Sequence, residues 1–316
     1  MPVVKRSWRQ PVLTWFRGQN QLWVEGEPDR LFSWVLDGEA DWVEEERKRW
    51  NRIREQQEKR QIRPVKGETR VRVLREERDE DGSILMHVSA HQRFFYLMEE
   101  GMCEQEEING FQLRLAEGSE GWSIAECRLA EEMDTDRSKV WSFYQPLREG
   151  EAAGTGYNRM QAVQYAETWW NGANPRYRKF TDDCTNFISQ CLHAGGIPMD
   201  FSRRRDSGWW YRGSRENWSY SWTVAHSLVN WLTKGRTARA RQVEDPRQLT
   251  PGDVICYDWE GDGRWQHNTI VTALDPAGMP LVNAHTVNSR HRYWDYRDSH
   301  AWTPKIRYRF FRIDAN

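Results

Sequence analysis

The sequence predicts an α+β protein of two domains, each with helices ahead of antiparallel strands. Three observations predict this. The chain has 316 residues, more than the roughly 100–200 residues of a usual single domain. In each half, a stretch with helical spacing of apolar residues precedes short alternating stretches separated by turn residues. Elements grouped in this way favour an α+β fold over alternating β–α–β units.

The composition allows packed cores and argues against a nucleic-acid partner. Hydrophobic residues make up 38% of the chain, charged residues 29%, and the 19 tryptophans can each bury a large area. The net charge is -1, and the basic stretches are interleaved with Glu and Asp. A nucleic-acid binder usually has a basic domain or stripe, so we expect this protein to have no nucleic-acid partner.

The sequence also predicts a cytoplasmic protein with no membrane span. The start, MPVVKRSWRQPVLTWFRGQNQLWVEG, lacks the apolar run of a signal peptide. No stretch approaches the roughly 20 apolar residues of a membrane span. The five cysteines are widely spaced without a CxxC pair, which favours neither a disulfide framework nor a cysteine-cluster zinc site.

Residues 1–150 are predicted to form an N-terminal domain of a long helix followed by antiparallel strands. The helix runs from about Pro28 to Arg63 and is ended by Pro64. The segment DEDG, from Asp79 to Gly82, is a turn signal, and a polar, then glycine-rich linker covers residues 131–156. The predicted strands are TRVRVLRE, ILMHVSA, QRFFYLM, EINGFQLRLA and EGWSIAECRLAEE.

Residues 151–316 are predicted to form a C-terminal domain of three helices followed by a sheet. The first helix, YNRMQAVQYAETWWNGAN, has apolar faces that include Met160. The second, CTNFISQCLHAGG, ends at Gly195-Gly196, where a helix C-terminus favours glycine, and the third is SWTVAHSLVNWL. The predicted strands are DVICYDW, HNTIVTAL, MPLVNAHT and IRYRFFRI.

Cys184 is the candidate nucleophile. It stands in the polar segment DDCTN, at the predicted first turn of the second helix. Unpaired backbone N–H groups at a helix start lower the pKa of a thiol and can hold an oxyanion. Cys191 lies farther along the same helix, between apolar residues, and is predicted to be a core residue. A buried structural thiol is the alternative for Cys184 as well.

Two histidines are candidates for activating this thiol. His267 opens a predicted strand directly after a polar loop, a position for a general base. His285 and Asn283 lie two residues apart on the next predicted strand and would share a face. A hairpin at DPAG would bring them beside His267, so either residue could orient its imidazole. Each histidine taken alone is more often structural.

The same segments resemble a known family. DCTNFISQCLHAGG is similar to the nucleophile helix of the bacterial "Putative amidase domain" family, a branch of the papain-like cysteine hydrolases related to NlpC-type peptidases and CHAP amidases. The resemblance covers about residues 155–312. It also includes YNRMQAVQYAETWWNGANPRYRKF, NWSYSWTVAHSLVNWL, LTPGDVICYDWEGDGRWQHNTIVT and PLVNAHTVNSRHRYWDY.

The resemblance implies a papain-like domain and a cofactor-free cysteine amidase or peptidase. Cys184 matches the nucleophile and His267 the general base. His285 matches the third residue of NlpC-type enzymes, with Asn283 as its rival. The implied reaction passes through a thioester acyl-enzyme, and the implied substrates are peptides or other amides, with peptidoglycan fragments among the candidates.

Other interpretations remain open at this point. Trp209, Trp210 and Tyr211 either pack in the core or form a wall of a substrate cleft. Cys184, His267 and His285 could instead hold the zinc ion of a hydrolase, since three such ligands plus water form a catalytic zinc site. A third alternative is a non-catalytic binding or structural module of the same fold.

Overall fold

The computed structural model describes residues 7–26, 32, 35, 37–99, 101–119, 121–130, 156–212, 217–234 and 240–314. The chain divides into two compact units. Unit 1 consists of Met1–Thr135 with Arg297–His300, and unit 2 of Asp136–Tyr296 with Ala301–Asn316. The domain boundary predicted near residue 150 lies outside the described residues and stays a prediction.

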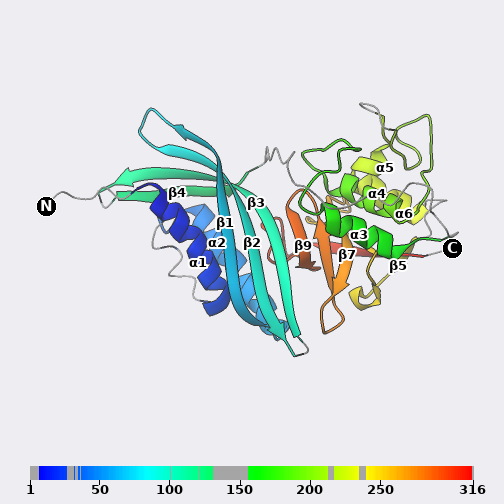
Figure 1. The fold of residues 1–316 in the computed structure, drawn as a ribbon, viewed down its shortest axis with the longest axis horizontal. Coiled ribbons are helices and arrows are strands. Elements are labelled where there is room, and N and C mark those ends of the chain that lie inside the picture. Colours follow the sequence, from blue (N-terminus) through cyan, green and yellow to red (C-terminus); the bar gives the residue numbers. More distant parts are fainter. Residues whose placement is uncertain are drawn as a thin grey trace. The chain divides into compact units, whose positions relative to one another are not determined.

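Unit 1 has two helices on one face of a curved antiparallel sheet (Figure 1). The strands follow one another in the order β1-β2-β3-β4. Residues Arg297–His300 belong to this unit because Arg52 Nε donates to the Arg297 carbonyl (2.9 Å) and His300 Nε2 lies 2.9 Å from a carboxylate oxygen of Glu46. The elements are α1 Arg9–Glu25, α2 Asp41–Lys59, β1 Arg63–Arg78, β2 Ile84–Met98, β3 Gly101–Gly118 and β4 Gly121–Leu129.

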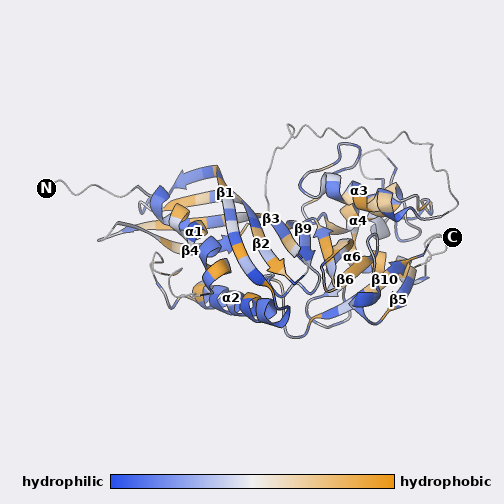
Figure 2. Ribbon diagram, turned by 60° about the horizontal axis from the view of Figure 1, so that its bottom comes forward, coloured by the Kyte–Doolittle hydropathy of each residue, from blue (hydrophilic) through white to orange (hydrophobic). Residues whose placement is uncertain are grey.

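The core of unit 1 follows from the alternation of β2. Ile84, Met86 and Val88 occupy every second position and are buried against α1 and α2. Trp50 and Ile53 supply the apolar stripe of α2, whose ribbon is otherwise mostly hydrophilic (Figure 2). The predicted combination of a helix with an antiparallel sheet is therefore confirmed for this unit.

Several details of unit 1 differ from the prediction. The helix α1 was not predicted from the sequence, and α2 begins at Asp41 rather than near Pro28. Pro64 lies inside the edge strand β1, where a missing N–H is tolerated. At Gly67 a Cβ would come within 2.9 Å of the Asn20 backbone, so α1 packs on β1 at the position that has no side chain.

Unit 2 has helices packed on an antiparallel sheet of order β9-β8-β7-β6-β10-β5. The three predicted helical segments and the four predicted strands are present, and the third helix is interrupted at Val224. The strands β5 and β9 were not predicted. The elements are α3 Arg159–Trp169, α4 Cys184–Ala194, α5 Tyr220–Thr223, α6 Ala225–Lys234, β5 Ala240–Val243, β6 Val254–Asp258, β7 His267–Leu274, β8 Pro280–Ala284, β9 Asn288–Tyr293 and β10 Arg307–Ile313.

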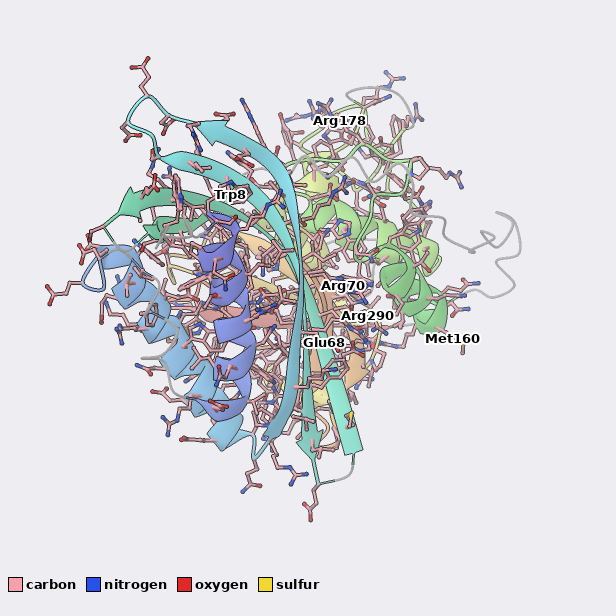
Figure 3. All side chains as sticks on the ribbon, turned by 60° about the vertical axis from the view of Figure 1, so that its left-hand side comes forward. Trp8, Glu68, Arg70, Met160, Arg178 and Arg290 are labelled. Atoms are coloured by element: carbon pink, nitrogen blue, oxygen red, sulfur yellow. The ribbon has the colours of Figure 1, made fainter. Side chains whose placement is uncertain are left out.

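The sheet of unit 2 buries both faces. Val254 and Ile270 pack in the core that includes α3, α4 and α6, while Ile255 and Val271 pack in a second core on the other face. Met160 was predicted to face a core, but it is 79% exposed and projects from the surface of α3 (Figure 3). Among the described residues, no helix is both long and apolar enough to span a membrane.

Candidate active site

The start of α4 presents backbone donors that no side chain caps. Cys184 is the first residue of α4 and is 5% exposed. Asp183 precedes it, but its Oδ1 accepts from the Phe180 N–H (3.0 Å) and from Asn186 Nδ2 (2.8 Å) rather than from the helix start. Among the described residues, no acceptor bonds the N–H groups of Cys184, Thr185 and Asn186. Such groups can stabilise an oxyanion.

The Cys184 sulfur lies among hydrogen-bonding groups. Its Sγ is 3.7 Å from Thr185 Oγ1 and 4.0 Å from the Gln266 carbonyl oxygen. Burial raises the pKa of the Cys184 thiol, and hydrogen bonds from the Thr185 hydroxyl, the Asn268 N–H and the Thr286 hydroxyl oppose that rise. The raised pKa keeps the group a thiol at neutral pH, so a base is required to form the nucleophile.

His267 does not contact the cysteine in this structure. It is the first residue of β7 and is 8% exposed, and its Nε2 lies 3.4 Å from the Tyr296 hydroxyl. The ring stacks on Trp259 at 5.8 Å. No hydrogen bond joins the His267 ring to the Cys184 sulfur among the described residues. Burial, with the charge of Arg292, lowers the pKa of His267 to about 3.

The alternation of β7 explains this orientation and corrects the expected contact. Neighbouring residues of a strand point to opposite faces. Asn268 Nδ2 donates to Thr185 Oγ1 on α4 (2.9 Å), so His267 lies on the face away from α4, beside Tyr257. The sequence placed His267 correctly at a strand start but could not tell which face of the sheet meets α4.

His285 lies next to the start of α4 but binds other partners than His267. It follows β8, and its Nδ1 is 2.8 Å from Asp183 Oδ2. Its Nε2 is 2.8 Å from the Trp169 carbonyl oxygen, and its ring stacks on Phe187 at 3.9 Å. Both ring nitrogens therefore face acceptors, and donating to both requires the imidazolium form.

Asn283 also forms its hydrogen bonds with residues other than His267. Its Oδ1 accepts from the Thr272 hydroxyl (2.8 Å) and the His291 N–H (2.9 Å), and its Nδ2 donates to Glu167 (2.8 Å). Neither candidate third residue thus contacts His267, contrary to the sequence-based expectation. The residue that forms a hydrogen bond with the His267 ring is Tyr296. Sequence reasoning missed it because no local spacing links it to His267.

The structure also bears on the three aromatic candidates and on the zinc alternative. Trp209, Trp210 and Tyr211 are buried in unit 2, with exposures of 0%, 3% and 9%. Trp209 stacks on Trp231 at 4.6 Å, so burial favours the packing interpretation of these residues. In the described parts of the chain, no three His, Cys, Asp or Glu side chains come together as a group that could hold a metal ion. Cys184, His267 and His285 therefore do not converge on one zinc position.

Comparison with known proteins identifies the region that holds Cys184. Residues 156–311 match the model of the family described as "Putative amidase domain". The chain is 47% identical over 239 residues to "Uncharacterized protein YhbB" of Bacillus subtilis (strain 168), which covers 75% of this chain and 70% of that protein. This alignment is longer than the family match and therefore extends beyond it.

A second protein of the same organism is a more distant relative. "Uncharacterized protein YjcM" is 30% identical over 143 residues, which are 42% of this chain and 32% of that protein. No solved structure matches the chain. The likeness to papain-like hydrolases therefore rests on the sequence and stays a prediction.

Proposed function

The chain belongs to the "Putative amidase domain" family, and we propose that it is a cysteine-dependent amide hydrolase with Cys184 as nucleophile. The observation that carries this proposal is the start of α4. There, the backbone N–H groups of Cys184, Thr185 and Asn186 have no acceptor among the described residues, and the Thr185 hydroxyl lies 3.7 Å from the cysteine sulfur. No other cysteine of the described residues opens a helix.

The proposed reaction has two steps. The Cys184 sulfur forms a bond to the amide carbonyl carbon, and the carbonyl π electrons move to the oxygen, which the free N–H groups stabilise. The C–N bond then breaks, and the amine leaves with a proton from the general acid, so a thioester remains. Water attacks the thioester, and the carboxylic acid and the thiol are released.

We propose His267 as the general base, as the family resemblance implies. It directly follows Gln266, whose carbonyl oxygen lies 4.0 Å from the Cys184 sulfur. Its ring is bonded to the Tyr296 hydroxyl instead. In the proposed mechanism the ring must leave Tyr296, on the face of β7 away from α4, before it can reach the sulfur and take its proton.

The third position of the site is proposed for His285 rather than Asn283. His285 binds Asp183, the residue directly before the nucleophile, whereas Asn283 is bonded to Glu167 and Thr272. In this role His285 fixes the start of α4 rather than the ring of His267. The substrates proposed are peptides or other amides, and peptidoglycan peptides are the first candidates.

Alkylation of the native protein tests the proposal without a known substrate. We expect iodoacetamide at pH 7 to modify Cys184 faster than Cys191 or Cys256, with the sites mapped by mass spectrometry. His267→Ala should slow the reaction at Cys184 and leave the other cysteines unchanged. If Cys184 is modified no faster than Cys256, its assignment as nucleophile is wrong. If the rate of Cys184 modification is unchanged in His267→Ala, the assignment of His267 as general base is wrong.

A substrate screen follows from a positive result. Peptidoglycan peptides and simple acyl amides should be cleaved by the wild-type protein and not by Cys184→Ala. Cleavage that survives in Cys184→Ala would contradict a cysteine mechanism directly.

A further inference from the structure

The hydroxyl of Thr185 is positioned to donate to the nucleophile. Thr185 is 1% exposed, and its Oγ1 lies 3.7 Å from Cys184 Sγ. Asn268, which is fully buried, donates its Nδ2 to the same oxygen at 2.9 Å. A hydroxyl has a single proton. Because Asn268 fills an acceptor position of Thr185, the Thr185 proton is free to point at the sulfur.

Asn268 shows a second sign of a constrained role. Its Oδ1 is buried and has no hydrogen-bond partner among the described residues. A buried acceptor without a partner is unfavourable and calls for an explanation. Here the side chain is held for its Nδ2, which donates to Thr185.

Thr286 supplies a third donor from a strained backbone. Its hydroxyl opposes the rise in the pKa of the Cys184 thiol, and its φ is 79°. A β-branched residue with positive φ is a clear outlier, and such strain collects at functional sites, where the surrounding structure enforces it. His285 precedes Thr286 and is fixed at both ring nitrogens, which anchors the chain just before the strained residue.

We propose that Thr185 and Thr286 are positioning residues that hold two hydroxyl donors on Cys184 Sγ and stabilise its thiolate. The proposal rests on the proposed role of Cys184 as nucleophile. When the thiol proton leaves for the base, the sulfur gains a full charge, and the Thr185 hydroxyl already lies 3.7 Å from it. Hydrogen bonds to charged groups are stronger than those to neutral groups, so the donors favour the thiolate over the thiol.

The charged and titratable surroundings make these donors necessary. Asp183 lies directly before Cys184, and its charge opposes the thiolate. Cys256 on β6 is near enough for the Cys184 charge to affect its own thiol. His285 is paired with Asp183, and His267 faces Tyr296. In this arrangement the thiolate has hydroxyl and backbone donors as its stabilising partners.

The test is the pH profile of Cys184 alkylation, in which the thiolate displaces iodide from iodoacetamide and forms a C–S bond. In Thr185→Val the midpoint should rise, and the rate at pH 7 should fall roughly ten- to a hundredfold, as for loss of a hydrogen bond to a charged group. The plateau at high pH should stay unchanged, because access to the sulfur is unaltered. Thr185→Ser keeps the hydroxyl and should behave like the wild-type protein.

Thr286→Gly separates positioning from structure. Glycine accepts a positive φ without strain, so the variant should unfold at about the wild-type urea concentration while Cys184 reacts several-fold more slowly at pH 7. Thr286→Ser should restore the rate. A residue with only a structural role would show no change of alkylation midpoint. Wild-type midpoints in both Thr185→Val and Thr286→Gly would overturn the proposal.

The outcomes remain distinguishable from those of the proposed function. If Thr185→Val does not fold, Asn268→Ala provides a second test. It removes the Nδ2 that donates to Thr185 Oγ1 and should also raise the midpoint of the alkylation profile. If Cys184 titrates with a midpoint that depends on Thr185 but cleaves no amide, the donors are retained and the hydrolase is rejected. If Cys184→Ala abolishes cleavage and the midpoints do not move, the hydrolase is retained and the donors are rejected.

Discussion

The two ends of α4 carry the same residue type in opposite surroundings. Cys184 opens the helix beside Thr185 and receives hydrogen bonds on its sulfur. Cys191 lies two turns later, fully buried with Ile188 and Leu192 in the core of unit 2. Burial raises the pKa of Cys191 well above its ordinary value. At Cys184 the same burial is opposed by three donors.

This comparison shows that position on the helix, rather than residue type or burial, separates a candidate nucleophile from a core residue. The first turn has free N–H groups and polar neighbours, whereas later turns have satisfied backbone groups and apolar neighbours. The difference between the two cysteines can be tested by substitutions at and near α4.

Replacing Cys184 and Cys191 by serine, one at a time, should give opposite effects on thiol reactivity and on stability. Cys184→Ser should abolish the fast iodoacetamide reaction at pH 7, because Cys191 lies in the apolar core, where burial raises the pKa of its thiol well above the ordinary value. Cys191→Ser should keep the fast reaction and instead lower the free energy of unfolding by about 1–3 kcal/mol, since a hydroxyl replaces an apolar-buried thiol. Mass spectrometry of the labelled protein and urea unfolding provide the two readouts. A fast reaction that survives in Cys184→Ser would reverse the comparison.

Asp183→Asn should disrupt the polar end strongly. The Asp183 carboxylate is buried and accepts from Phe180, Asn186 and His285. An amide replaces one acceptor by a donor, and we expect a loss of about 2–4 kcal/mol in the free energy of unfolding at pH 7. Asp182→Asn is the matched control, because Asp182 is exposed and should change stability by less than about 0.5 kcal/mol. Equal effects of the two variants would show that the buried network is not important for stability.

The stability of the protein should also be sensitive to acid through His267. Its pKa is about 3 in the folded protein, below the ordinary value of about 6.5. The unfolded chain therefore binds more protons between these values, and stability falls as the pH drops through this window. The slope approaches about 1.4 kcal/mol per pH unit, so the wild-type protein should lose about 2–3 kcal/mol more than His267→Gln between pH 6.5 and 4.5. Urea unfolding at both pH values measures this, and parallel losses in the two proteins would contradict it.

Gly195→Ala should have a smaller, purely steric effect at the apolar end. A Cβ at Gly195 would come within 2.3 Å of the Tyr157 ring, and overpacking of this kind typically costs about 1–3 kcal/mol. Gly172→Ala is the control, since nothing lies within 4 Å of its Cβ position. The fast reaction of Cys184 should persist in both variants. A thermal unfolding midpoint equal to that of the wild-type protein in Gly195→Ala would show that Tyr157 moves freely aside.

Local patterns determined much of the fold. The helical spacing in residues 184–196 and the alternation in residues 84–90 predict α4 and β2, because each depends only on near neighbours in the chain. The short strands β5 and β9 and the helix α1 were not predicted. The strand β5 depends on a partner distant in sequence, with Phe310 beside Val243, whereas β9 pairs with the nearby strand β8.

Local sequence patterns predicted that Cys184 stands at a polar helix start and that His267 opens a strand. They did not predict which side chains meet there, because that depends on how the elements pack. Alternation fixes that His267 and Asn268 point to opposite faces of β7, but it cannot say which face packs on α4. The structure places Asn268 toward Thr185 and His267 toward Tyr296. Likewise the positive φ of Thr286 and the pairing of His285 with Asp183 arise from packing between elements about 100 residues apart in the chain, which no local pattern encodes.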